Sequence, residues 1–357
     1  MKIVSIVGAR PQFIKAAPVS AALRKKHEEL LLHTGQHYDE NMSRIFFDEL
    51  SIPRPDLNLE VGSDSHARQT AAIMIGIENY LQKENPDLLL IYGDTNSTLA
   101  GAIAASKIHI KVAHVEAGLR SFNRTMPEEI NRIVADKVAD ILFCPTKTAV
   151  ENLASEGISN GVYNIGDVMF DAALRFAPIA EQKSDVLKKL IIEPKSYLLF
   201  TLHRAENTDS YQNLSNIVNA IIQPEKLIIF PVHPRTVKLL KQNRLYDKLE
   251  QAENIKLIEP VSFLDMIKLE QNAHKILTDS GGVQKEAYFY EVPCITLRNE
   301  TEWVETVDDG WNCLVGANGD EIIAAINDFS PTSQQMGHYG DGKASEKLVE
   351  VLNQYFN

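Results

Sequence analysis

Cysteine and long apolar segments are scarce in this sequence. Its 357 residues include three cysteines, Cys144, Cys294 and Cys313, which are widely spaced and form no CxxC pair. That pattern is typical of reduced thiols in a cytosolic protein. No uncharged apolar run approaches the ~18 residues that a membrane-spanning helix needs, and the N-terminal apolar run, 3–7, is too short for a signal sequence. We therefore expect a soluble, cytoplasmic protein.

Positive charge is also in short supply. The chain carries 36 Lys and Arg against 48 Asp and Glu, a formal net charge of -12. This excess of negative charge disfavours binding to nucleic acid or to an anionic membrane through the overall field. A local cluster of Arg and His can still hold one small anion.

The signatures of nicotinamide and metal chemistry are missing as well. No GxGxxG follows the first expected strand, and the only YxxxK match, 339–343, contains two glycines that disfavour a helix. His33 and His37, with Asp39 nearby, are separated by a Thr-Gly pair that predicts a turn. We therefore predict neither hydride chemistry nor a metal site, and assign Gln36 and His37 to a polar loop that faces a ligand.

The sequence does contain a regular alternation of short apolar runs and helix-length amphipathic segments. This rhythm is typical of βαβ units, in which helices cover both faces of a parallel sheet. A segment without a strand, from about 166 to 194, separates two such arrays, so we expect a two-lobed α/β protein with a cleft. The expected strands are 2–8, 30–37, 88–92, 111–115, 141–145 and 162–165 in the first array, and 197–202, 227–232, 255–258, 275–278 and 294–297 in the second.

Three carboxylates stand where an expected buried element gives way to a turn or a helix. Asp94 follows the run 88–92 and a glycine, and Glu116 follows the run 111–115. Glu128 stands at the start of a helical pattern. The carboxyl ends of parallel strands line one crevice, where ligands bind. Acids that converge on such a crevice suggest proton chemistry.

The turn after the first expected strand has the composition of a phosphate cradle. Gly8 permits a sharp turn, and Pro11 favours the start of a helix. Arg10 then lies at a helix N-terminus, where the helix dipole favours an anion. Lys15 follows about one turn later and can reach the same anion. The alternative is that both cations are ordinary surface residues.

A second turn of this kind follows the strand expected at 275–278. Ser280, Gly281 and Gly282 are small enough to let backbone N–H groups approach a phosphate closely. Glu286, about one helical turn farther along, suits hydrogen bonds from a ribose diol. The alternative is an ordinary glycine-containing turn with a solvated Glu286.

Two histidines with arginine neighbours follow two further strands of the second array. His203 precedes Arg204 directly, and His233 lies two residues before Arg235. Each histidine can donate to a departing phosphate or transfer a proton. A purely structural histidine is the alternative at both positions.

Eight segments, in their order along the chain, closely resemble the non-hydrolysing UDP-N-acetylglucosamine 2-epimerase family: GARPQFIKAAP, HTGQHYDENM, GDTNST, HVEAGLRSFNRTMPEEINR, HRAEN, FPVHPRT, TDSGGVQKEA and YGDGKAS. The resemblance implies two Rossmann-like lobes in a glycosyltransferase-B-like arrangement. It implies domains at 1–167 and 168–342, with a last helix, 343–357, that packs back on the first. It further implies a UDP-sugar in the interdomain cleft, no cofactor, and a homodimer.

The same resemblance implies an activity. In this family UDP is eliminated across C1–C2 to leave a bound 2-acetamidoglucal, and is then added back with C2 inverted. The implied substrate pair is UDP-N-acetylglucosamine and UDP-N-acetylmannosamine, in the service of cell-surface polysaccharide synthesis. Matching motifs imply catalytic roles for Asp94, Glu116, Glu128 and His203. They imply UDP binding and phosphate stabilisation by Arg10, Lys15, His233, Phe263, Ser280, Gly281, Gly282 and Glu286.

Two departures from the family pattern keep alternatives open. GARPQ and MPEE stand where many members have GTRPE and WPEE, which favours the branch that acts on UDP-2,3-diacetamido-2,3-dideoxyglucuronate. That substrate calls for a cation near C6, which Arg298 or Lys285 can supply. A hydrolysing epimerase, which releases UDP and free N-acetylmannosamine, shares the fold. A glycosyltransferase is disfavoured because an inverting transfer needs only one base. A catalytically silent UDP-sugar sensor is disfavoured because the implied catalytic groups are intact.

Overall fold

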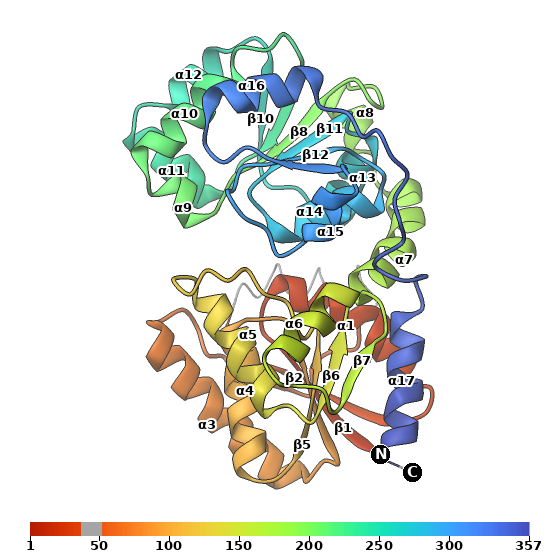
Figure 1. The fold of residues 1–357 in the computed structure, drawn as a ribbon. Helices are drawn as coiled ribbons and strands as arrows, with labels where there is room; N and C mark the ends of the chain where they lie inside the picture. The colour runs from red at the N-terminus through yellow and green to blue at the C-terminus, as the bar shows by residue number, and fades with distance from the viewer. Residues whose placement is uncertain (37–51, 357) are drawn as a thin grey trace. The chain divides into compact units, whose positions relative to one another are not determined.

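The computed structural model describes residues 1–36 and 52–356, so His37 and Asp39 lie outside the described residues. The chain forms two compact units. The first comprises Met1–Arg175 and Gly337–Asn357, and the second comprises Phe176–Met336. Each unit contains one parallel β-sheet flanked by helices (Figure 1).

The sheet of the first unit has seven parallel strands in the order β3-β2-β1-β4-β5-β6-β7. These strands are β1 (Lys2–Val7), β2 (Glu28–His33), β3 (Leu57–Asn58), β4 (Leu88–Tyr92), β5 (Lys111–Val115), β6 (Ile141–Cys144) and β7 (Val162–Asn164). All five residues of β4 are buried, as expected for a central strand that is covered on both faces.

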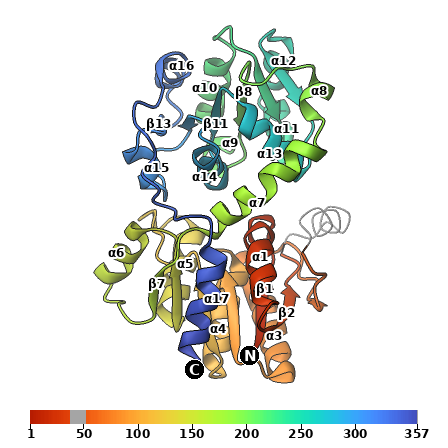
Figure 2. The same ribbon diagram turned by 90° about the vertical axis from the view of Figure 1, so that its right-hand side faces the viewer.

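Helices cover both faces of this first sheet. The helices that belong to it are α1 (Arg10–Leu23), α3 (His66–Glu84), α4 (Asn96–Lys107), α5 (Pro127–Val138), α6 (Lys147–Ser155), the start of α7 (Val168–Lys183), and α17 (Ala344–Tyr355). Side chains of α3, α4 and α5 share one apolar core with β1 and β4. Helix α17 lies against α1 (Figure 2), and Asp171 on α7 accepts hydrogen bonds from the first backbone N–H groups of α17, those of Ala344 (3.0 Å) and Ser345 (2.7 Å).

The second unit repeats the design with six parallel strands in the order β10-β9-β8-β11-β12-β13. Its strands are β8 (Leu198–Thr201), β9 (Ile228–Pro231), β10 (Ile255–Ile258), β11 (Lys275–Thr278), β12 (Cys294–Thr296) and β13 (Asn312–Leu314). Its helices, besides the end of α7, are α8 (Val186–Leu190), α9 (Ala205–Thr208), α10 (Tyr211–Ile221), α11 (Pro234–Gln242), α12 (Tyr246–Gln251), α13 (Phe263–Asn272), α14 (Gly281–Phe289), α15 (Val304–Asp308) and α16 (Gly319–Asp328). One core packs α10, α11, α12 and α16 on one face, and a second packs α8, α13 and α14 on the other.

Both sheets reverse their strand order at one point. In each, the first strand in the chain pairs with the second on one side and with the fourth on the other, so the switch points lie between β1 and β4 and between β8 and β11. Ligands of such sheets bind beyond the carboxyl ends of the strands at this point. We therefore expect ligand-binding and catalytic residues in the turns that follow these strands.

The strands predicted from apolar runs are confirmed to within a few residues. The short edge strands β3 and β13 were missed, because two or three residues carry too little pattern to recognise. The segment 339–343 is not helical, since Gly340 and Gly342 take positive φ values of 90° and 75°, which confirms that its Tyr and Lys do not share a helical face. Among the described residues, no helix combines the length and hydropathy needed to cross a bilayer.

Candidate active site

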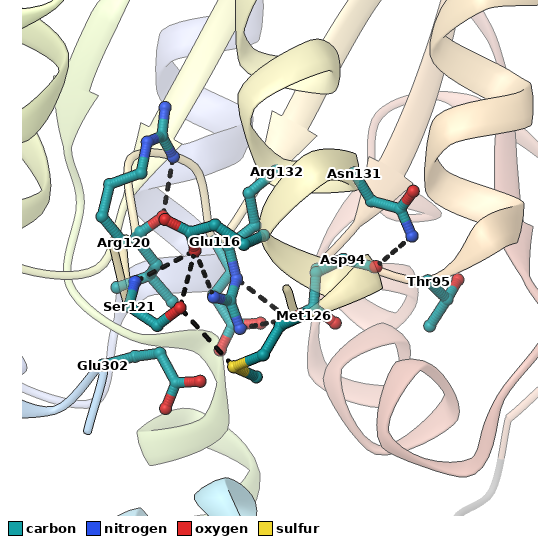
Figure 3. A network of polar contacts seen from close by, with 12 residues as sticks. Asp94, Thr95, Glu116, Arg120, Ser121, Met126, Asn131, Arg132 and Glu302 are labelled. Carbon is teal, nitrogen blue, oxygen red and sulfur yellow. Dashed lines mark hydrogen bonds and ion pairs between the residues drawn. The ribbon is translucent and has the colours of Figure 1, made fainter. Parts of the chain in front are cut away.

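The turn after β4 presents Asp94 at the switch point of the first sheet. Gly93 makes this turn with a φ of 61°, and its N–H donates to the carbonyl oxygen of Val115 on β5 (3.0 Å). Asn131 on α5 donates to the main-chain oxygen of Asp94 (2.8 Å). The Asp94 carboxylate thus stands on a turn that is fixed from two neighbouring elements (Figure 3).

Arg132 on α5 holds the side chain of Asp94. Its Nε and Nη2 both donate to Oδ2 of Asp94, at 3.0 and 2.6 Å, as Figure 3 shows. The remaining terminal nitrogen, Nη1, donates to Oε2 of Glu129 at 2.8 Å. Charge-assisted bonds of this kind are stronger than neutral ones and fix direction as well as distance. One buried guanidinium therefore orients the Asp94 carboxylate and ties it to α5.

Glu116 occupies the turn after β5 in an unusual backbone conformation. Its φ is 71°, in the left-handed region that costs a residue with a side chain about 1 kcal/mol or more. Its side chain is buried and forms an ion pair with Lys15 of α1. A Cβ built on Gly93 would lie 3.2 Å from Nζ of Lys15 and 3.3 Å from Oε2 of Glu116, so this pair lies against the Asp94 turn.

The position of Lys15 suggested a side chain free to bind a phosphate, whereas in the structure the side chain is already paired. Only 8% of its surface is exposed, and its ammonium group faces a carboxylate. The predicted contact with a phosphate stays a prediction. What the structure adds is a partner for Glu116 that no local pattern in the sequence connects to it.

Glu128 and Glu129 stand side by side at the start of α5 but have different surroundings. Glu129 is 1% exposed, and its carboxylate accepts bonds from the backbone N–H groups of Ser121 (3.0 Å) and Phe122 (3.0 Å) as well as from Arg132. Glu128 is half-buried and makes no hydrogen bond or ion pair with any described residue. Glu129 thus anchors the loop before α5, and Glu128 carries the carboxylate that is available for chemistry.

The turn after β1 is held by Gln12. Its Oε1 accepts from the N–H groups of Gly8 (2.8 Å) and Ala9 (3.1 Å), while its Nε2 donates to the carbonyl oxygen of Tyr92 (2.8 Å). A neutral amide accepts at one atom and donates at the other, whereas an ionised carboxylate only accepts. Gln12 therefore fits this turn through both polar atoms of its amide. Arg10 is the first residue of α1, as predicted.

Gly8 itself is a position where the chain has no room for a side chain. A Cβ there would lie 2.2 Å from Oγ1 of Thr34 and 2.4 Å from Oγ of Ser97. Ser97 also donates to the side chain of Gln36 at 2.7 Å, so the described start of the polar loop after β2 meets the first turn of α4. His33, just before that loop, is buried against the Phe13 ring at 5.2 Å between centroids, and burial lowers its pKa to about 4.

In the second unit, Asp279 organises the turn after β8. This carboxylate is fully buried and accepts from the backbone N–H groups of His203 (3.1 Å) and Arg204 (2.9 Å) and from the side chain of Asn207 (3.3 Å). It also lies 3.5 Å from Nδ1 of His203. Asp279 was not among the predicted site residues, although its place directly after β11, in TDSGG, is the same signal that marks Asp94.

The pKa of His203 is lowered, chiefly because surrounding protein atoms partly desolvate the ring, although 46% of the side chain is exposed. The carboxylate of Asp279 opposes this shift, whereas three groups reinforce it: Arg204, His233 and Arg235. Near neutral pH the imidazole is therefore mostly uncharged, and positive charge in this part of the unit comes from the arginines.

His233 and Arg235 stand at the start of α11, after β9. Nδ1 of His233 caps this helix by accepting from the N–H of Arg235 (3.2 Å). The Arg235 guanidinium donates to the main-chain oxygen of His203 (3.3 Å) and to Asp209 (2.5 Å). The two histidines are thereby linked through one arginine, as their adjacent strand ends suggested.

The N-terminus of α14 provides the second predicted cradle. Ser280 is its N-cap, but no described side chain caps its first N–H groups. A Cβ on Gly282 would meet nothing closer than Oγ of Ser280 at 3.9 Å, so the space beyond this residue is open. A Cβ on Gly281 would lie 3.8 Å from Nη2 of Arg204 and 3.8 Å from Oε2 of Glu302, so a cation and a carboxylate both lie beside the same helix start. Small residues, a helix dipole and a guanidinium together suit a phosphate.

Two predicted residues of the second unit have neighbours that the sequence did not indicate. Glu286 lies on α14 near Glu270, whose carboxyl is buried without a described hydrogen-bond partner. Burial, reinforced by the charge of Glu286, raises the pKa of Glu270 well above its usual value. Phe263 is 6% exposed and packs edge-on against Phe176, with ring centroids 5.5 Å apart, so its ring belongs mainly to the core.

The two candidate cations for a uronate are both buried in this unit. Arg298 is 3% exposed and donates from both terminal nitrogens to Glu302, at 3.0 and 3.3 Å. Lys285 is 1% exposed, with Nζ 3.8 Å from the centre of the Trp303 ring. Across residues 1–36 and 52–356, His, Cys, Asp and Glu side chains form no group of three or more that could hold a metal ion.

Known proteins resemble this chain over nearly its whole length. A family model described as UDP-N-acetylglucosamine 2-epimerase matches residues 21–353. A Methanococcus maripaludis protein named UDP-N-acetylglucosamine 2-epimerase homolog is 59% identical over 354 residues, which is 99% of each chain. A UDP-2,3-diacetamido-2,3-dideoxy-D-glucuronate 2-epimerase from Pseudomonas aeruginosa is 48% identical over 362 residues, again 99% of each. The crystal structure of Methanocaldococcus jannaschii UDP-GlcNAc 2-epimerase in complex with UDP-GlcNAc and UDP matches with a TM-score of 0.92 and 47% identity, over 99% of this chain and 100% of that one.

Proposed function

This chain belongs to the UDP-N-acetylglucosamine 2-epimerase family, and on that premise we propose that it is an isomerase that interconverts UDP-N-acetylglucosamine and UDP-N-acetylmannosamine. The reaction eliminates UDP, leaves an unsaturated sugar bound, and adds UDP back with the configuration at C2 inverted. The family membership confirms the resemblance seen in the sequence, and the solved relatives confirm the fold class of two Rossmann-like units of the glycosyltransferase-B type.

The observation that carries the proposal is the set of separately held carboxylates at neighbouring strand ends of the first unit. Asp94 is oriented by Arg132, Glu116 faces Lys15, and Glu128 has no described partner. Inversion at C2 requires a base on one face of the carbon and a proton donor on the other, so more than one acid is needed. Acids with different neighbours can take different protonation states in one site.

The cationic groups of the second unit support the other half of the reaction. The C2 proton becomes removable only as the bond between C1 and the diphosphate breaks, because the departing group then carries the electron pair. Donors that are already in place stabilise that developing charge most effectively. We assign this role to the start of α14 at Ser280–Gly282, with Arg204 beside it. His203 donates a hydrogen bond to the leaving phosphate in this proposal. Arg10, Lys15, His233, Phe263 and Glu286 complete the proposed UDP site.

The substrate proposal rests on what surrounds the candidate cations. A uronate at C6 would need an available positive charge, whereas Arg298 is neutralised by Glu302 and Lys285 lies against an aromatic ring. This favours the neutral sugar, UDP-N-acetylglucosamine. The diacetamido-glucuronate remains the second candidate, because a relative with that name is 48% identical to this chain.

The test is incubation with each UDP-sugar in D2O, followed by proton NMR. We expect deuterium at C2 of both epimers and intact nucleotide sugar, with UDP-N-acetylglucosamine converted faster than the diacetamido-glucuronate. Release of UDP and free N-acetylmannosamine would instead assign the hydrolysing reaction. Transfer of a sugar with unlabelled C2 to an acceptor would overturn the epimerase proposal.

We further propose that the chain acts as a cytoplasmic homodimer that serves cell-surface polysaccharide synthesis. Light scattering on the purified protein tests the dimer, for which a mass of twice 39.9 kDa is expected. A single-chain mass at the concentration of the activity assay would contradict it.

A further inference from the structure

His114 is a buried histidine in the strand that leads to Glu116. It lies on β5, two residues before that acid, and none of its surface is exposed. Its Nε2 lies 2.7 Å from the main-chain oxygen of Gly93, the residue before Asp94. Its Nδ1 lies 2.7 Å from Oδ1 of Asp136 on α5. One imidazole therefore bridges the Asp94 turn and the helix that carries Glu128.

Asp136 continues this bridge to the turn that carries Glu116. Its other oxygen, Oδ2, accepts from the N–H of Gly118 at 3.1 Å and from Nη1 of Arg120 at 2.7 Å. Arg120 in turn forms a two-point ion pair with Glu156, at 2.7 and 2.9 Å. Although burial alone would raise the pKa of Asp136, its bonds to His114 and Arg120 lower it, so this carboxylate is ionised.

Both groups that the His114 imidazole contacts are hydrogen-bond acceptors. A carbonyl oxygen only accepts, and so does an ionised carboxylate. Each ring nitrogen of His114 lies 2.7 Å from one of these acceptors, Nε2 from the main-chain oxygen of Gly93 and Nδ1 from Oδ1 of Asp136. Removing either bond leaves a buried acceptor without a partner, which costs about 1–3 kcal/mol and favours rearrangement of the turn.

We propose that His114 is a positioning residue, which with Asp136 fixes the two acid-bearing turns, Gly93–Asp94 and Glu116–Gly118, relative to each other. The Glu116 turn in particular needs such support, because a residue with a side chain takes a positive φ of 71° there. A reacting group must be held within about 0.5 Å of its productive place, and a shift of ~1 Å can cost about 100-fold in rate. This inference rests on the proposed function in one respect only, that Asp94 and Glu116 act on the sugar.

Two conservative variants separate the two bonds of the imidazole. In His114→Asn the side-chain amide takes the place of Nδ1, so it keeps the bond to Asp136 and loses the one to Gly93. In His114→Gln the amide takes the place of Nε2, so it keeps the bond to Gly93 and loses the one to Asp136. His109→Asn, at an exposed position with a φ of 62°, is the matched control in the same unit.

We expect His114→Asn to lower kcat about 100-fold and His114→Gln to lower it about 10-fold, with the Kd for UDP within about twofold of wild type in both. Crystal structures of the two variants should show the Gly93–Asp94 peptide displaced in His114→Asn and unmoved in His114→Gln. A purely structural histidine would instead lower the unfolding temperature and leave kcat unchanged in the folded variants. Wild-type kcat in both variants, or loss of the folded state in both by circular dichroism, would overturn the proposal.

The two proposals fail in different ways. If the wild-type protein epimerises neither UDP-sugar, the proposed function fails, whereas the crystal structures still test whether His114 sets the turn. If the wild type is active and the Gly93–Asp94 peptide is in the same place in both variants, the function stands and the positioning role is wrong.

Discussion

The two units of this chain have the same strand order around their switch points, and they carry different chemistry there. In the first unit the turns after β4 and β5 hold carboxylates, each bonded to a cation from another helix. In the second unit the turns after β8 and β11 hold a histidine, an arginine and a glycine-containing helix start with open space beyond it. The difference teaches that topology fixes where a site forms, while a few residues at the strand ends fix what it can do.

The two switch points also differ in how firmly hydrogen bonds and ion pairs hold their side chains. Asp94 and Glu116 are tied by charge-assisted bonds, and Gln12 and His114 bond the backbones of the surrounding turns. In the second unit, Asp279 fixes the backbone, but His203, His233 and Gly282 are exposed. We expect the first arrangement to serve the chemical step and the second to receive the nucleotide. Changes made in one unit at a time can break or sharpen that division.

The largest effect is expected from removing one acid of the first unit. Asp94→Asn keeps the size of the side chain and a hydrogen bond to Arg132 but removes the charge. We expect kcat to fall about 1000-fold, because the step loses a proton-transfer group, while calorimetry shows UDP binding within about twofold of wild type. Asp64→Asn, at an exposed position of the same unit, is the control. Activity of Asp94→Asn near that of the control would remove Asp94 from the proposed chemistry.

A smaller effect, on UDP binding and not on kcat, is expected from a change at the start of α14 in the second unit. Gly282→Val places two methyl groups where a phosphate would approach α14, in space that is open in the protein itself. We expect UDP to bind about 10- to 100-fold more weakly, a loss of ~1.4–2.7 kcal/mol, with an unchanged unfolding temperature. Gly319→Val, at the start of α16, is the matched control because its Cβ would also meet only ordinary contacts, at 3.8 Å or more. Equal UDP affinity in the two variants would contradict the cradle.

The smallest effect concerns the pH dependence of the second unit. The pKa of His203 is lowered, so the acid limb of the kcat/KM profile should lie below pH ~6.5, the ordinary value for histidine. Arg235 contributes to that lowering. Removing its charge in Arg235→Gln should raise the pKa and move the limb to higher pH, by less than about one unit. Lys238→Gln, one turn farther along α11, removes a charge that is not among those that shift the pKa of His203. A limb that moves equally in both variants, or toward lower pH, would exclude His203 as its source.

Local patterns in the sequence carried much of this description. The apolar run 88–92 predicted β4, and the helical pattern that begins near Glu128 predicted the start of α5, because burial and helix geometry act within a few residues. The placing of Asp94 and Ser280 after strands followed from the same reasoning. Arg132 escaped prediction, although it lies one helical turn after Glu128, on the side of α5 that meets the Asp94 turn.

The sequence by itself determined two α/β arrays, the turns at the ends of their strands, and the family to which these turns belong. Only the tertiary structure decided which polar groups meet: Lys15 with Glu116, Arg132 with Asp94, and His114 with both the main-chain oxygen of Gly93 and Asp136. The physical reason is range. A strand or a helix start is specified by residues that are neighbours along the chain, whereas an ion pair joins groups that become neighbours only after the sheet and its helices have packed.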